Sequence, residues 1–89
     1  MDIHPGDIVY SKAGRDKGKY FFVTQMIDDQ YVYICDGDIR RLEKPKKKKL
    51  KHLQAVPNTV LYIKQKFETS QKLTNSELRK GLAAFISET

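Results

Sequence analysis

The sequence is short of several residue types, and each shortage excludes a class of protein. It contains no tryptophan and a single cysteine, Cys35, so it has no intramolecular disulfide framework. No apolar run approaches the roughly 18 residues that a membrane-spanning helix needs, and no charged leader precedes an apolar stretch. We therefore expect a cytoplasmic protein without a membrane partner, and the 89 residues suffice for one domain with a small core.

Residue patterns that build catalytic or metal sites are also missing. His4, Cys35 and His52 are far apart in the sequence and lack the paired spacings of zinc sites. The aspartates of Asp28-Asp29 and Asp36-Gly37-Asp38 are better explained as turn residues, because aspartate bonds its neighbouring backbone and glycine accepts positive φ. No nucleophile with a matching base is evident. We therefore expect that the protein is not an enzyme and that it binds no metal, cofactor or small-molecule substrate.

Acidic residues are scarce in the middle of the chain, where basic residues gather. Residues 1–38 carry four Lys/Arg and seven Asp, whereas residues 39–56 carry eight Lys/Arg and only Glu43, a sum of +7. The whole chain is +6, so this one stretch supplies the entire excess. Such a block creates a strong local field, and nucleic acid is the commonest large polyanion in a cell. A solvated surface segment and a nuclear localisation signal are the alternative interpretations.

The first half of the sequence predicts strands separated by turns. Runs rich in β-branched and aromatic residues occupy 8–10, 20–27 and 31–35, and glycine or aspartate follows or precedes each of them. Short strands at this spacing favour a small antiparallel barrel or meander. One or two closing strands are expected from a further set of apolar residues: Ile39, Leu42, Leu50, Leu53 and Val56.

The last third changes to a helical period. Val60, Ile63 and Phe67 recur at three and four residues, which suits a helix with Asn58 as N-cap, although a strand is an alternative for 60–63. A second helix is predicted after the capping box formed by Thr74 and Glu77. Its apolar face is expected to cover the sheet or the preceding helix, and consists of Leu78, Leu82, Phe85 and Ile86.

The segment 6–19, GDIVYSKAGRDKGK, resembles the KOW motif of ribosomal proteins and of NusG-type transcription elongation factors. Gly6-Asp7 precedes the first strand, Gly14 closes it, and Gly18 lets the loop turn sharply into the next strand. With the turn at Gly37 and the basic stretch from Arg40, the pattern resembles small bacterial KOW proteins related to large-subunit ribosomal protein fourteen of eukaryotes and archaea.

This resemblance implies a mainly β fold, an SH3-like (KOW) small barrel over residues 1–56 with a basic arm at 40–52, followed by a C-terminal α-helical extension over 57–89. It also implies binding to ribosomal RNA or other structured RNA, with ribosomal proteins as further partners. The alternatives are a protein-interaction or transcription-elongation-type module that docks on a polymerase or a ribosomal protein, and architectural DNA binding. The residues expected to contact RNA are Arg15, Lys17, Lys19, Arg40, Arg41, Lys44, Lys46, Lys47, Lys48, Lys49, Lys51 and His52.

Aromatic residues offer a second kind of RNA contact. Tyr10, Tyr20, Tyr31 and Tyr33, with the pair Phe21-Phe22, are expected mostly to fill a barrel that has no tryptophan. Strand alternation requires only one of the two phenylalanines in the core, so Tyr20 or Phe21 is the candidate for an exposed stacking ring.

Overall fold

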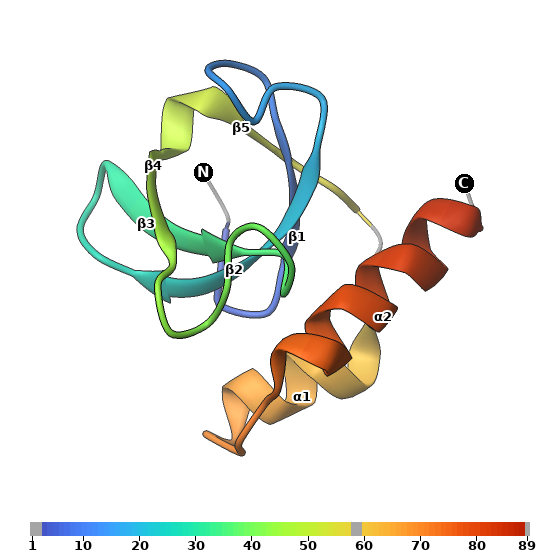
Figure 1. Cartoon of the computed structure of the whole chain (residues 1–89). Helices are drawn as coiled ribbons and strands as arrows, with labels where there is room; N and C mark the ends of the chain where they lie inside the picture. The colour runs from blue at the N-terminus through green and yellow to red at the C-terminus, as the bar shows by residue number, and fades with distance from the viewer. Residues whose placement is uncertain (1–2, 58–59, 89) are drawn as a thin grey trace.

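The computed structural model describes residues 3–57 and 60–88, which form a five-stranded antiparallel sheet and two helices (Figure 1). The strands are β1 (Ile8–Ser11), β2 (Tyr20–Met26), β3 (Tyr31–Cys35), β4 (Lys46–Lys49) and β5 (Leu53–Ala55). A single 3₁₀ turn at Leu50–His52 joins β4 to β5. The first three strands confirm the sequence prediction, and β5 contains one of the expected closing residues, Leu53.

The strands follow the order β4-β3-β2-β1-β5, so the lysine-rich strand lies at one edge of the sheet. Figure 1 shows the sheet curling into a barrel-like body. A register shift between Val23 and Gln25 interrupts the β2–β3 ladder, and such bulges increase the local bend of a sheet. The prediction placed the basic segment in an arm, but Lys46–Lys49 pairs with Ile34–Tyr31, four of the five residues of β3.

Two hydrophobic cores lie on opposite faces of the sheet. The barrel interior holds Val9, Phe21, Val32 and Ile34, while Phe22 packs on the other face beneath the helices. Phe21 and Phe22 are both fully buried because each face of β2 is covered. The expectation that Phe21 is an exposed stacking ring is therefore wrong.

The helices α1 (Leu61–Glu68) and α2 (Asn75–Ser87) lie together on one side of the sheet (Figure 1). The helical interpretation of residues 60–67 is confirmed, with Val60 as N-cap, while Asn58 lies outside the described residues. The Thr74–Glu77 capping box is present, as predicted. Of the expected apolar face, Leu78, Leu82 and Phe85 are buried, but Ile86 is 49% exposed.

The glycine at position 37 allows α2 to approach the sheet. Its φ is +81°, and a Cβ at this position would overlap the carbonyl oxygen of Asn75 in the first turn of α2. Nearby, Cys35 is fully buried in the helix-facing core, and this burial raises the pKa of its thiol to about 11. Within residues 3–57 and 60–88, no helix is long and apolar enough to cross a membrane.

Candidate nucleic-acid interface

The four lysines of β4 divide between the two faces of the sheet because side chains alternate along a strand. Lys48 lies opposite the buried Val32 and is only 8% exposed. Its ammonium donates to the carbonyl oxygen of Ala13 over 2.7 Å, which anchors the loop between β1 and β2. Lys48 thus acts within the fold, although it was expected to contact RNA.

Lys47 and Lys49 point the opposite way and converge on one aromatic ring. The Nζ of Lys47 lies 4.5 Å from the centre of the Tyr31 ring, and the Nζ of Lys49 lies 5.9 Å from it. Tyr31 is directly across from Lys49 in the β3–β4 ladder, and Tyr33 is across from Lys47. Strands β3 and β4 therefore present two tyrosines and two ammonium groups on the same outer face.

The turn before β4 forms a basic concavity of about 600 Å³. Five of its eight lining residues carry a positive charge, and Glu43 is the one acidic residue among them. Its lining residues are Ile39, Arg40, Arg41, Glu43, Lys44, Pro45, Lys46 and Lys47. Because Lys47 also contacts Tyr31, the concavity continues directly into the outer face of β4.

Glu43, the acidic residue that lines this concavity, is hydrogen-bonded to the first turn of helix α2. The side-chain amide of Asn75 donates to Glu43, and Arg41 Nε donates to the same carboxylate over 3.0 Å. These hydrogen bonds, that of Asn75 above all, lower the pKa of Glu43 to about 2. Asn75 also accepts from the backbone N–H of Leu42 over 2.7 Å. The start of α2 therefore fixes the shape of the basic turn.

The loop at residues 12–19 lies next to the basic turn. Its Asp16 is 5% exposed and accepts a hydrogen bond from Arg40 Nη2 over 3.2 Å. Gly18, with φ of +88°, donates its N–H to the carbonyl of Ser11 over 2.9 Å and so closes the hairpin. Three basic residues of this loop are exposed: Arg15, Lys17 and Lys19. The loop and the basic turn, 24 residues apart in sequence, are thus joined.

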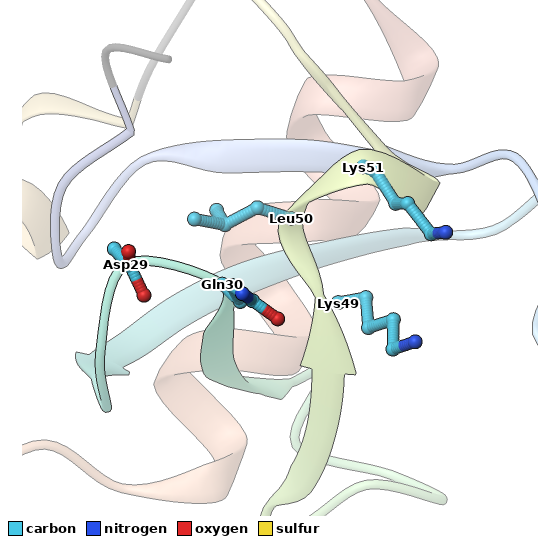
Figure 2. Close-up of a pocket in the computed structure, with 5 residues that line it drawn as sticks. All are labelled: Asp29, Gln30, Lys49, Leu50 and Lys51. Carbon is cyan, nitrogen blue, oxygen red and sulfur yellow. The ribbon is translucent and has the colours of Figure 1, made fainter.

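At the other end of β4, a hollow of about 330 Å³ is lined by Asp29, Gln30, Lys49, Leu50 and Lys51. Figure 2 shows Lys49 and Lys51 extending to one side of the chain and Leu50 to the other. His52 follows, and its pKa is lowered, first by desolvation and then by the charges of Lys51, Lys48, Lys49 and Lys12. His52 is therefore a neutral group in a positive field near pH 7.

Compared with known proteins, the chain matches no protein-family model and no curated protein sequence. The geometry of its own residues is therefore the basis for assigning a function.

Most of the residues predicted to contact RNA lie in one region of the structure, but their side chains differ in how exposed they are. Exposed are Arg15, Lys17, Lys19, Arg41, Lys44, Lys46, Lys47 and Lys51; half-buried are Arg40, Lys49 and His52; buried is Lys48. The sequence analysis did not include two residues of this region, Lys12 and Tyr31, among the expected contacts. Lys12 donates its backbone N–H to the His52 carbonyl over 2.8 Å, a pairing across 40 positions that no local pattern predicts. Tyr31 was assigned to the barrel filling, and only its strand partner shows that it faces outward.

Proposed function

We propose that this protein is a non-catalytic RNA-binding protein, that its sheet is an SH3-like barrel of the KOW type, and that it binds ribosomal RNA or another structured RNA. The loop at 12–19, the basic turn and the outer face of β4 form the contact surface. Lysine and arginine bond mainly to phosphates, so the protein reads the shape of the RNA more than its sequence.

The observation that carries the proposal is a row of lysines without carboxylate partners. In the part of the chain that the structure describes, five lysines of this region make no ion pair: Lys44, Lys46, Lys47, Lys49 and Lys51. Elsewhere lysines pair with carboxylates, as in the half-buried pairs Lys64–Asp7 and Lys66–Glu77. Mutual repulsion of the five ammonium groups costs free energy in the unbound protein, and a polyanion relieves it.

The KOW assignment is supported by the first hairpin. Asp7 accepts from the backbone N–H of His4 over 2.8 Å and pairs with Lys64, which connects the start of β1 to α1. Gly14 and Gly18 adopt positive φ on either side of the exposed Arg15 and Lys17. These two backbone conformations are compatible with a KOW motif.

The test is the salt dependence of binding to a fluorescently labelled RNA hairpin. If about six basic side chains contact phosphates, the logarithm of the association constant falls against the logarithm of salt concentration with a slope of roughly −4 to −5. A competing DNA duplex of the same length separates RNA binding from architectural DNA binding. A flat salt response would contradict the proposal.

A matched pair of double variants locates the surface. Lys47→Glu with Lys49→Glu reverses two charges on β4, whereas Lys72→Glu with Lys80→Glu makes the same change at exposed positions 72 and 80. The first variant is expected to weaken RNA binding tenfold or more, and the second only severalfold through net charge. Equal losses would show that β4 is not the contact surface.

Ribosomal RNA as the target has its own test. Sedimentation of a cell extract on a sucrose gradient at low salt is expected to show the protein with the large subunit or with whole ribosomes. Recovery only at the top of the gradient would contradict a ribosomal target.

A protein-interaction module is the second candidate, and one observation favours it. A groove of about 400 Å³ lies between the 12–19 loop and α2, and its lining includes Tyr20, Leu82 and Ile86. Ile86→Ala separates the two functions, because it removes apolar area from the groove without changing any charge. RNA affinity that persists in this variant, together with loss of an association with a ribosomal protein, would favour the interaction module.

A further inference from the structure

Tyr31 and Tyr33 lie outside both hydrophobic cores. Each is half-buried on the outer face of β3, whereas their neighbours Val32 and Ile34 are fully buried in the barrel. Among the described residues, the partly buried hydrophobic side chains packed on the two cores include Tyr20 and Leu50 but neither of these tyrosines. Filling the core therefore does not explain why aromatic rings occupy both positions.

The two rings form a regular arrangement with their strand neighbours. Tyr33 lies in a cross-strand row between Gln25 of β2 and Lys47 of β4, and Tyr31 lies beside it, opposite Lys49. Gln25 and Lys47 are exposed, so the row opens to solvent. The helices cover the other end of this face, around Phe22 and Cys35.

We propose that this outer face, centred on Tyr31 and Tyr33, is a stacking platform for an unpaired base of RNA. The inference rests on the proposed RNA-binding function and specifies the ligand. That ligand is an RNA helix interrupted by a bulge or loop, rather than a continuous duplex. An aromatic ring can stack on any base, and an ammonium beside it can bond the phosphate of the same nucleotide.

The Lys47–Tyr31 geometry fits this chemistry. An ammonium 4.5 Å from the ring centre shows that the electron-rich face of the ring is accessible from the solvent side. An exposed cation–π contact is weak, so a base displaces the lysine at little cost. The released ammonium then has a phosphate within reach.

The hollow beside the platform suits the polar edge of a base. Lys49 belongs to both, since it lies 5.9 Å from the Tyr31 ring centre and lines the hollow with Gln30 and Asp29 (Figure 2). The Gln30 amide both donates and accepts hydrogen bonds, and the Asp29 carboxylate accepts them. Asp29 repels a phosphate, so an exocyclic amine of a base is the better occupant.

The experiment compares two RNA hairpins that differ only by one unpaired adenosine, replaced by fluorescent 2-aminopurine for detection. We expect the wild-type protein to bind the bulged hairpin about tenfold more tightly than the paired one, and to quench the 2-aminopurine by stacking. Tyr31→Leu with Tyr33→Leu is expected to abolish both the preference and the quenching, while binding to the paired hairpin changes less than about twofold.

Two control variants separate stacking from structure. Tyr31→Phe with Tyr33→Phe keeps the rings and is expected to keep the preference, whereas Tyr62→Leu alters an exposed tyrosine on α1 and should change nothing. Thermal unfolding is measured for each protein. If the leucine variant is folded at the assay temperature and still prefers the bulged hairpin and quenches the 2-aminopurine, the inference is overturned.

The outcomes also separate this inference from the proposed function. Equal, salt-dependent binding of the wild-type protein to both hairpins would overturn the platform and leave RNA binding intact. Absence of binding to either hairpin at low salt would overturn the proposed function itself. Loss of preference in the leucine variant with unchanged affinity for the paired hairpin would support both.

Discussion

The guanidinium of Arg40 lies 3.2 Å from the carboxylate of Asp16, and this ion pair joins the hairpin loop to the basic turn. The Asp16 side chain is 7% exposed and that of Arg40 is 27% exposed, so water screens the pair only in part. Arg40 Nε is buried and has no hydrogen-bond partner among the described residues. Asp16 therefore provides the main compensation for a partly desolvated cation.

Replacing this acid should destabilise the protein. We expect Asp16→Asn to lower the free energy of unfolding by about 2 kcal/mol, because it leaves the Arg40 charge without its partner. For a domain of this size that corresponds to a fall in midpoint of roughly 10 °C, measured by circular dichroism. Arg41→Gln breaks the exposed pair with Glu43 and should leave the midpoint nearly unchanged. Similar losses in both variants would contradict this assignment.

Neighbouring lysines of β4 should respond differently to the same substitution. Lys48→Met removes the donor to the Ala13 carbonyl and should cost about 1 kcal/mol of stability, with little effect on RNA affinity. Lys47→Met should leave stability unchanged and reduce the salt slope of RNA binding by about 0.7 to 0.9. Thermal unfolding and fluorescence anisotropy measure the two effects. A larger loss of RNA affinity in Lys48→Met than in Lys47→Met would reverse the assigned roles.

Gly37 and Gly18 offer a comparison between steric overlap and backbone strain. Both have positive φ, but only a Cβ at Gly37 would meet the backbone of α2, while the nearest atom to a Cβ at Gly18 is Tyr10 Oη at 3.8 Å. We expect Gly37→Ala to destabilise the protein by about 3 kcal/mol and Gly18→Ala by about 1 kcal/mol. Urea unfolding measures both. Equal effects would show that α2 tolerates displacement from the sheet.

The lowered pKa of His52 predicts a pH dependence of stability. Because the unfolded chain binds this proton at a higher pH than the folded protein does, acid favours unfolding. The contribution of neutral His52 to the free energy of unfolding is complete above about pH 6.5. It is lost as the pH falls through the lowered pKa of this residue in the folded protein. His52→Gln should therefore flatten the decline in unfolding midpoint as the pH falls below about 6.5. An unchanged pH profile in this variant would contradict the lowered pKa of His52.

Local signals explain which parts of this structure the sequence predicts. The Thr74–Glu77 capping box and the β-rich run from Tyr20 depend on residues close in sequence, and both appear as expected. The strand at Lys46–Lys49 has no such local signal, because lysine has a low β propensity. It forms through pairing with Tyr31–Ile34. Long-range pairing decides the structure at this point.

The same distinction applies to the candidate site. Charge counting locates the basic segment, but it treats four lysines as equivalent. Only the pairing register shows that Lys48 points into the barrel and that Lys47 and Lys49 meet Tyr31 on the outer face. The Arg40–Asp16 pair depends on a tertiary contact in the same way, so the connection between loop and turn has no sequence signature.

The most direct test of the central claim is an NMR titration of the ¹⁵N-labelled protein with an RNA hairpin. The account predicts that the largest chemical-shift changes occur in residues 12–19, 30–33 and 40–52, and that the exposed face of α2 is unaffected. Changes concentrated around Leu82 and Ile86, with the amides of β4 unmoved, would contradict RNA binding through the lysine strand.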